Sequence, residues 1–345
     1  MKAAILTRIG EIVFTETEKP TFNDSEMLVR VKAATICGTD LRIIRGKKTK
    51  GVRIPSIIGH EFSGEVVEIG KDVENFSQGE RVCVDPVLPC GQCFYCLHGM
   101  ENVCLNRKAI GYEYDGCFAE YVRIPADFIK SGNVQIVPQG VSWVASALAE
   151  PFGCCLNGQR KLDISLGDTV TVIGAGPIGL MHSMLAKASG AGEVIVSEPN
   201  EKRREMALKF GADLLVDPIK ESLEEVVLAN TNGIGADVVI LAIGNPQLAN
   251  IVLKLARKGG RISLFAGFSK GDMPAMDVNL IHYNELEVFG ASALQRRDLK
   301  KALDLMEKKL VEVDGLVSHT FTLENILEAV ALAESGEAIK VALTP

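Results

Sequence analysis

The segment from Val170 to Glu198 constrains the fold of this chain more than any other. It begins with a short run of β-branched apolar residues, Val170–Ile173, which leads directly into the turn Gly174-Ala-Gly-Pro-Ile-Gly179. A helical pattern follows, and a second apolar run, Val194–Val196, ends shortly before Glu198. The order of strand, glycine turn, helix, strand and acid is typical of a unit in a doubly wound parallel sheet.

The glycines of this turn have distinct physical roles. Gly174 permits the tight turn, Gly176 lets the backbone approach a pyrophosphate, and Gly179 lets the helix pack closely against the strand. The first amides of the helix, near Pro177 and Ile178, and the positive end of its dipole then face the phosphates.

Glu198 follows the glycine turn at the distance expected for the acid that accepts hydrogen bonds from adenosine ribose. A carboxylate at this place repels a 2′-phosphate. The segment therefore predicts a dinucleotide site that favours NAD over NADP.

Length and charge narrow the class of protein further. The chain has 345 residues, of which 47% are hydrophobic, which is enough for two domains with separate cores. Its net charge of −7 argues against nucleic acid as a partner. No apolar run approaches membrane-spanning length, and Met1–Leu6 leads into a strand pattern rather than a cleavable signal. We expect a cytoplasmic protein that binds neither nucleic acid nor a membrane.

The pattern of elements changes near residue 150. Earlier residues form short β-type segments punctuated by glycine and proline, as at Met27–Ala33, Gly64–Ile69 and Arg81–Val84. This part predicts a β-rich, barrel-like domain. A helix capped by Ser142 is expected to end before Pro151.

Strands and helices then alternate as far as residue 290. Further strands are expected at Leu214–Val216, Asp237–Leu241, Arg261–Phe265 and Leu286–Phe289, and helices at Glu201–Phe210, Leu223–Ala229 and Gln247–Arg257. The sequence thus predicts an α/β protein, with a six-stranded parallel dinucleotide-binding domain at residues 151–290. The remaining segment adds helices around Leu299–Leu310 and Leu323–Ala333 and a strand, Ala338–Ala342, that is expected to return to the first domain. That domain therefore comprises residues 1–150 and 291–345.

Four of the nine cysteines lie in one short segment: Cys90, Cys93, Cys96 and Cys104. In a chain without a secretion signal, this clustering favours a metal over disulfides. Tetrahedral zinc needs four soft ligands on a backbone that can curl around it, and Gly91 and Gly99 provide turns. Because four thiolates leave no open position, the site is predicted to be structural. Two alternatives are that the thiols are unrelated and that His98 competes as a ligand, although a solvent-facing histidine is the simpler interpretation.

A second set of metal-ligand residues lies elsewhere in the chain. Cys37 begins a Cys-Gly-Thr-Asp turn, and His60 and Glu61 follow in a Gly-His-Glu motif. A catalytic zinc keeps three protein ligands and one exchangeable position. Glu150, near the domain boundary, is a candidate for the third ligand.

At this point the chain resembles the zinc-dependent medium-chain dehydrogenases. That family carries, in the same order, the Cys37–Asp40 turn, the Gly59–Gly64 motif continued by Gly70 and Val73, the cysteine loop and the glycine turn. The Glu-Pro pair at 150–151 is similar to the sorbitol and polyol dehydrogenase branch. The Cys37–Asp40 turn and the segments 116–121 and 151–153 are similar to L-threonine 3-dehydrogenase.

The resemblance implies a GroES-like catalytic domain, a Rossmann domain, and a homo-oligomer that is a dimer or a tetramer. It also implies two zinc ions per chain, with the catalytic ion bound by Cys37, His60 and Glu150. Glu61 would be a direct or alternating ligand, and Thr39 would relay the proton of the alcohol.

For the cofactor, the resemblance implies that Glu198 and Arg203 hold the adenosine ribose and that Ile178 packs near the pyrophosphate. One departure concerns Arg42, which replaces a histidine that passes the proton to solvent in many relatives. Arginine stays protonated and cannot act as a base. Either the proton leaves through another group or water, or Arg42 binds an anionic part of the substrate or cofactor, or it is a solvated loop residue.

We therefore predict a zinc-dependent enzyme that transfers a hydride from a secondary alcohol of a polyol or sugar alcohol to NAD. The enzymatic alternatives are an L-threonine or other amino-alcohol 3-dehydrogenase and a dehydrogenase of a phosphorylated polyol. A non-catalytic protein that senses NAD is the alternative from a different class.

Overall fold

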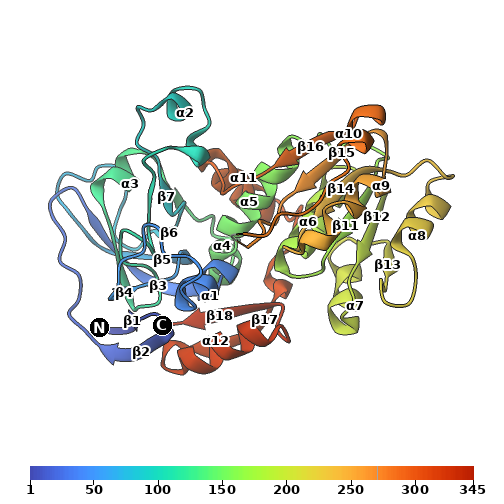
Figure 1. Ribbon diagram of the computed structural model, residues 1–345. Helices are drawn as coiled ribbons and strands as arrows, with labels where there is room; N and C mark the ends of the chain where they lie inside the picture. The colour runs from blue at the N-terminus through green and yellow to red at the C-terminus, as the bar shows by residue number, and fades with distance from the viewer. Residues whose placement is uncertain (270) are drawn as a thin grey trace. The chain divides into compact units, whose positions relative to one another are not determined.

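The computed structural model describes residues 1–269 and 271–345 (Figure 1). The chain divides into two compact units. Unit 1 comprises residues 1–153 and 293–345, and unit 2 comprises residues 154–292. Among the residues with assigned positions, no helix combines the length and the apolar character that crossing a membrane requires.

Unit 2 contains a six-stranded parallel sheet in the order β13-β12-β11-β14-β15-β16. The strands are β11 (Thr169–Ile173), β12 (Glu193–Ser197), β13 (Leu214–Val216), β14 (Ala236–Leu241), β15 (Ala256–Leu264) and β16 (Glu287–Gly290). The chain moves outward from β11 to β13 and then continues on the other side of β11 with β14. Open α/β sheets bind ligands where the strand order reverses, so the end of β11 is the expected place for a cofactor. The predicted doubly wound sheet is confirmed.

The first three helices of unit 2 lie close to their predicted positions, and the last one was not predicted. They are α6 (Pro177–Ala188), α7 (Glu201–Lys209), α8 (Leu223–Asn230), α9 (Ile251–Leu255) and α10 (Val278–Tyr283). Asn200 and Ser222 cap α7 and α8 by accepting hydrogen bonds from backbone amides of the first turn.

One predicted helix is wrong in its extent. Instead of a continuous helix over Gln247–Arg257, the chain forms a 3₁₀ turn, η2 (Pro246–Leu248), and the short helix α9. Asn245 caps the 3₁₀ turn by accepting a hydrogen bond from the Gln247 amide. The helix stops at Leu255 because Ala256 already pairs with Ala236 of β14.

Unit 1 is β-rich, as predicted. Its largest sheet has the order β10-β6-β5-β3-β18-β17, with β9 also paired to β3. These strands are β3 (Met27–Thr35), β5 (Glu61–Ile69), β6 (Arg81–Val84), β9 (Tyr121–Ile124), β10 (Val134–Ile136), β17 (Val317–Thr322) and β18 (Lys340–Thr344). Smaller sheets are formed by β1 (Lys2–Arg8), β2 (Glu11–Glu16) and β4 (Ser56–Ile57), and by β7 (Val87–Leu88) and β8 (Lys108–Ala109).

The end of the chain belongs to this unit because β18 pairs with β3 in antiparallel fashion. The predicted return of the last strand to the first domain is therefore confirmed. The helices of this part are α11 (Arg296–Glu307) and α12 (Ile326–Ser335). Three phenylalanines, Phe62, Phe118 and Phe128, are fully or almost fully buried in the core of the unit.

The helix predicted to be capped by Ser142 and to end before Pro151 is present, but a second helix that was not predicted follows it. Ser142 caps α4 (Trp143–Ala147) by accepting a hydrogen bond from the Ala145 amide at 2.9 Å. A new helix, α5 (Ala149–Arg160), then begins immediately and runs through Pro151. Proline is tolerated there because it lies in the first helical turn, where its missing N–H has no intrahelical acceptor to lose.

Candidate active site

The first candidate metal ligand, Cys37, lies at the beginning of α1 (Gly38–Ile44). Its backbone amide donates to Asp40 Oδ2 at 2.8 Å. The other oxygen of this fully buried carboxylate, Oδ1, lies 3.1 Å from His60 Nδ1. Asp40 therefore fixes the start of α1 and the orientation of the His60 ring together. With Nδ1 engaged, Nε2 is the nitrogen that remains for a metal.

Glu61 completes a group of possible metal ligands. The ligand atoms of Cys37, His60 and Glu61 all lie within 4.8 Å of one another. Glu61 Oε2 accepts from Lys340 Nζ at 2.6 Å and from the hydroxyl of Thr35. Both members of this ion pair are buried, with exposed fractions of 1% for Glu61 and 6% for Lys340.

Tyr112 lies beside the ligand group and is also influenced by the charge of Glu150. Its ring centroid lies 5.9 Å from that of His60. Burial raises the pKa of Tyr112 to about 12, and His60 opposes this rise while Cys37, Asp40 and Glu150 add to it. Glu150 is buried in the first turn of α5, and its charge influences the Tyr112 hydroxyl together with the charges of Cys37 and Asp40. Thr39 is half-buried in the first turn of α1.

The electrostatics of the group suit a divalent cation. Burial alone would lower the pKa of His60, but Asp40 and Cys37 hold that pKa well above its usual range. Lys340 behaves similarly, since burial lowers its pKa and the charge of Glu61 raises it overall. Acidic groups therefore dominate the site. A thiol and an imidazole backed by a carboxylate form a donor set that zinc prefers.

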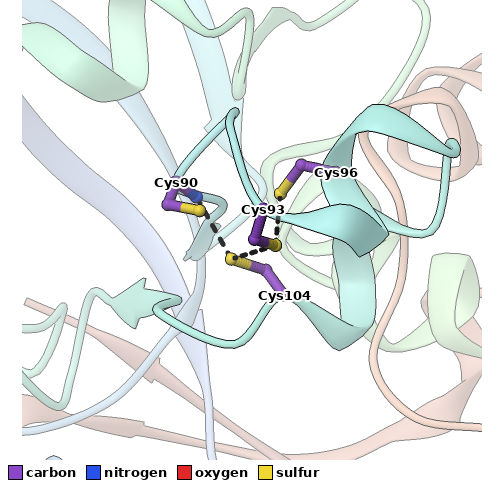
Figure 2. Close-up of side chains that lie close together, drawn as sticks. All are labelled: Cys90, Cys93, Cys96 and Cys104. Atoms are coloured by element: carbon purple, nitrogen blue, oxygen red, sulfur yellow. Dashed lines mark hydrogen bonds between the residues drawn. The ribbon is translucent and has the colours of Figure 1, made fainter.

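The four-cysteine segment folds into a second compact group (Figure 2). Its members are Cys90, Cys93, Cys96 and Cys104, whose sulfur atoms all lie within 4.8 Å of one another. The short helix α2 (Phe94–Leu97) follows the second cysteine, and the 3₁₀ turn η1 (Glu101–Val103) precedes the last. Gly91 and Gly99 adopt positive φ angles of 73° and 71°, which provide the turns that the sequence indicated.

Backbone amides point at these sulfur atoms. Cys104 Sγ accepts from the amides of Cys90 at 3.2 Å and Asn106 at 3.4 Å. Hydrogen bonds from the amides of Leu105 and Cys96 lower the pKa of Cys93 to about 6. Four thiols with donors aimed at them fit a closed tetrahedral zinc site.

His98 does not belong to this sulfur group. It is exposed, its Nδ1 lies 2.7 Å from the carbonyl oxygen of Phe94, and its ring stacks on that of Phe94 at 4.1 Å. The simpler interpretation, a histidine facing solvent, fits these contacts.

The glycine turn of unit 2 has the geometry expected of a phosphate-binding loop. Gly174 has a φ of +101°, and its amide donates to the carbonyl oxygen of Ser197 at 2.8 Å. A Cβ at Gly179 would overlap the carbonyl oxygen of Gly174. A Cβ at Gly176 would have no protein atom within 4 Å. Packing therefore requires glycine at 179, whereas Gly176 leaves space at the start of α6, where Pro177 is the first helical residue.

Glu198 lies at the end of β12 beside this turn. Its carboxylate accepts from the amides of Ala175 and Asn200, each at 2.9 Å. Arg204 donates to the Glu198 carbonyl oxygen at 2.8 Å and forms an ion pair with Asp217 at 3.3 Å. Arg203 lies in the first turn of α7, where its amide donates to Asn200 Oδ1 at 3.1 Å.

Comparison with known proteins matches both parts of the chain to family models. Residues 23–133 match the alcohol dehydrogenase GroES-like domain, and residues 177–308 match the zinc-binding dehydrogenase model. A sorbitol dehydrogenase of Halalkalibacterium halodurans is 34% identical over 349 residues, which cover 100% of this chain and 99% of the relative. An L-threonine 3-dehydrogenase of Pyrococcus horikoshii is 36% identical over 348 residues, or 99% of this chain and 97% of the relative.

The chain belongs to the zinc-dependent medium-chain dehydrogenase family. The resemblance stated from the sequence is thereby confirmed, as is the combination of a GroES-like domain with a Rossmann sheet.

Solved structures of two similar dehydrogenases contain different cofactors. A zinc-binding dehydrogenase of Sinorhizobium meliloti 1021 bound to NADP has a TM-score of 0.93 and 32% identity, covering 100% of this chain and 99% of its own. An alcohol dehydrogenase from E. coli CFT073 complexed with NADH has a TM-score of 0.91 and 33% identity, with the same coverage.

Sequence reasoning missed three residues that this dehydrogenase places at the ligand group. Asp40 belongs to the Cys37–Asp40 turn, and an acid three residues after Cys37 is a capping signal, but the motif does not indicate its contact with His60. A lysine at 340 within an otherwise apolar strand was a sign of a buried partner. Nothing in the sequence indicated Tyr112.

Proposed function

We propose that this dehydrogenase transfers a hydride from a secondary alcohol carbon of a polyol or sugar alcohol to NAD. The observation that carries the proposal is the convergence of Cys37, His60 and Glu61 in a buried acidic site. The catalytic zinc would be held by Cys37, His60 and Glu150, with Glu61 as an alternating ligand. When bound, zinc polarises the substrate hydroxyl, and NAD accepts the hydride.

The protein's own residues prepare this chemistry. Asp40 engages His60 Nδ1, which leaves Nε2 for the metal, and the buried charge of Glu61 is balanced by Lys340. In this proposal the Thr39 hydroxyl takes the proton of the alcohol as it gives its own proton to water. Arg42 cannot take part in that relay because a guanidinium remains protonated.

The preference for NAD rests on Glu198 and Arg204. The carboxylate of Glu198 is fixed by two backbone amides beside the glycine turn, where it would repel a 2′-phosphate. Arg204 is engaged with two carbonyl oxygens and with Asp217, so it is not poised to receive that phosphate. Gly174, Gly176, Pro177, Ile178 and Gly179 would face the pyrophosphate, and Glu198 and Arg203 the ribose.

We further propose a second, structural zinc at Cys90, Cys93, Cys96 and Cys104. A cytoplasmic location and a homo-oligomer, either a dimer or a tetramer, remain predictions. Size-exclusion chromatography with light scattering tests the oligomer.

The principal alternative is oxidation of L-threonine or another amino alcohol, which is supported by the 36% identity to an L-threonine 3-dehydrogenase. The decisive experiment follows NADH absorbance with a panel of polyols, sugar-alcohol phosphates and L-threonine. We expect faster NADH formation with polyols than with L-threonine. Turnover confined to L-threonine would replace the proposal with its alternative.

A further inference from the structure

A basic loop lies next to the proposed zinc site in unit 1. The carbonyl oxygen of Arg42, in the last turn of α1, accepts from the amides of Lys47 at 2.8 Å and Lys48 at 3.1 Å. The loop therefore folds back against α1, the helix that follows Cys37. Lys48 Nζ donates to the Lys50 carbonyl oxygen at 2.8 Å, which holds the ammonium group in place.

Lys48 approaches the metal-ligand group through one aromatic ring. Its Nζ lies 5.2 Å from the centroid of Tyr112, and the His60 ring lies 5.9 Å from the same centroid. A cation and a proposed zinc ligand therefore share a neighbour. A substrate whose hydroxyl group lies at His60 could extend along Tyr112 toward Lys48.

Lys48 lies near three other cations and one carboxylate. Burial and the charges of Arg107, Lys50 and Arg42 lower the pKa of Lys48, against which Glu113 acts in the opposite direction. The Glu113 carboxylate already accepts from the Ala109 amide at 2.8 Å.

The two flanking arginines, Arg45 and Arg53, each form an ion pair with an acidic residue. Arg45 pairs with Glu334 and Arg53 with Asp115, each at 2.7 Å. Within the described part of the chain, Lys48 and Arg42 form no such ion pair. A cluster of unpaired cations on a chain with a net charge of −7 indicates a local site for an anion.

We propose that Arg42, Lys48, Lys50 and Arg107, here called the cationic cluster, bind a negatively charged end of the substrate. The preferred substrate is then a polyol with a terminal carboxylate or phosphate, which ammonium and guanidinium groups bind through charge-assisted hydrogen bonds. This inference rests on the proposed function and narrows its substrate class.

The test compares three compounds with one carbon skeleton: sorbitol, gluconate and sorbitol 6-phosphate. Their oxidation is measured at saturating NAD and constant ionic strength. We expect kcat/KM for one of the anions to exceed that for sorbitol by about tenfold or more. Gluconate and sorbitol 6-phosphate distinguish a carboxylate from a phosphate.

Variants connect that preference to the cluster. Lys48→Gln and Arg42→Gln should each raise KM for the preferred anion by about tenfold and change sorbitol kinetics by less than about twofold. Lys47→Gln is the matched control, because Lys47 is an exposed cation of the same loop. It should leave all three substrates unchanged.

Three kinetic results would overturn the inference. The first is a kcat/KM for both anions that does not exceed that for sorbitol. The others are an equal fall in kcat/KM for all three compounds in Lys48→Gln, and a raised KM for NAD in that variant with every substrate. Isothermal titration of zinc-loaded enzyme with NADH bound supplies a readout without turnover. Tighter binding of an anion than of sorbitol, lost in Lys48→Gln, supports the cluster even if no alcohol is oxidised. In that case the proposed function fails alone, whereas equal binding of all three compounds overturns the cluster.

Discussion

At the scale of single residues, Asp40 has the largest influence on the proposed zinc site without being a proposed ligand. One oxygen accepts from the amide of Cys37 and the other contacts His60 Nδ1. A carboxylate behind a ligating histidine fixes the tautomer and strengthens the nitrogen as a donor. Two ligands distant in the sequence are thereby positioned by one side chain.

We predict that Asp40→Asn lowers zinc affinity at this site by about 10- to 100-fold, the usual effect of losing such a partner. Competition with a chromogenic chelator measures the affinity. The zinc of the four-cysteine group should be unaffected in the same protein. Asp127→Asn, at an exposed acid in the first turn of α3 (Ala126–Lys130), is the control. Unchanged zinc affinity in Asp40→Asn would contradict the positioning role.

Cofactor choice is the second property decided by single residues. We predict that Glu198→Ala reduces the preference for NAD over NADP by about tenfold, because one repulsive charge is removed. Stability should also fall by about 1–3 kcal/mol, since the amides of Ala175 and Asn200 lose their acceptor. The ratio of kcat/KM with the two cofactors measures the preference, and the exposed Glu201→Ala is the control. A wild-type enzyme that uses NADP as readily as NAD would refute the assignment.

At the scale of elements, a buried ion pair links two strands that are far apart in the sequence. Thr35 of β3 pairs with Glu61 of β5 and with Ala342 of β18, so the β3 strand lies between them. This register brings Lys340 Nζ to 2.6 Å from Glu61 Oε2. Breaking a buried pair is costly because the remaining charge has no partner.

We predict that Lys340→Met lowers the free energy of unfolding of unit 1 by about 3–5 kcal/mol. The double variant Lys340→Met with Glu61→Gln should recover much of that loss, since no isolated charge remains. Urea unfolding followed by fluorescence of Trp143, which lies in unit 1, gives the comparison. The exposed pair of Lys71 with Asp24 serves as control, where Lys71→Met should cost less than about 1 kcal/mol. A double variant no more stable than Lys340→Met would show that charge isolation is not the cause.

The same register shows where sequence reasoning reached its limit. Alternating and apolar runs were enough to place β3, β6, β13 and β14 nearly to the residue, because local patterns determine strands. The pairing of β18 with β3 depends on long-range packing, so the partner of Glu61 could not be read from a local motif. For the same reason Tyr112, which lies in a loop between two short strands, carried no signal.

At the scale of the whole molecule, the possible metal ligands form two groups that differ in chemical character. The four-cysteine group is complete in itself, with sulfur atoms within 4.8 Å of one another and backbone amides directed at them. The group of Cys37, His60 and Glu61 is mixed and, in the proposed mechanism, keeps one exchangeable position. Motif spacing was sufficient to bring together the four cysteines, and the recognisable turns singled out Cys37, His60 and Glu61, whereas the third ligand predicted for the second site, Glu150, is not a member of that group. The ligand roles themselves remain predictions.

The difference between the all-thiol group and the mixed group leads to a prediction about metal removal. We predict two zinc ions per chain by elemental analysis, and loss of activity in chelator before any loss of fold. A closed tetrathiolate site releases its ion slowly, because no position is open for the chelator to enter, whereas an open site exchanges readily. Activity, zinc content and circular dichroism are followed together over time. Cys93→Ser should bind one zinc per chain and still lose activity to chelator at the wild-type rate. One zinc in a fully active chain, or simultaneous loss of activity and fold, would contradict the division into an exchangeable and a closed site.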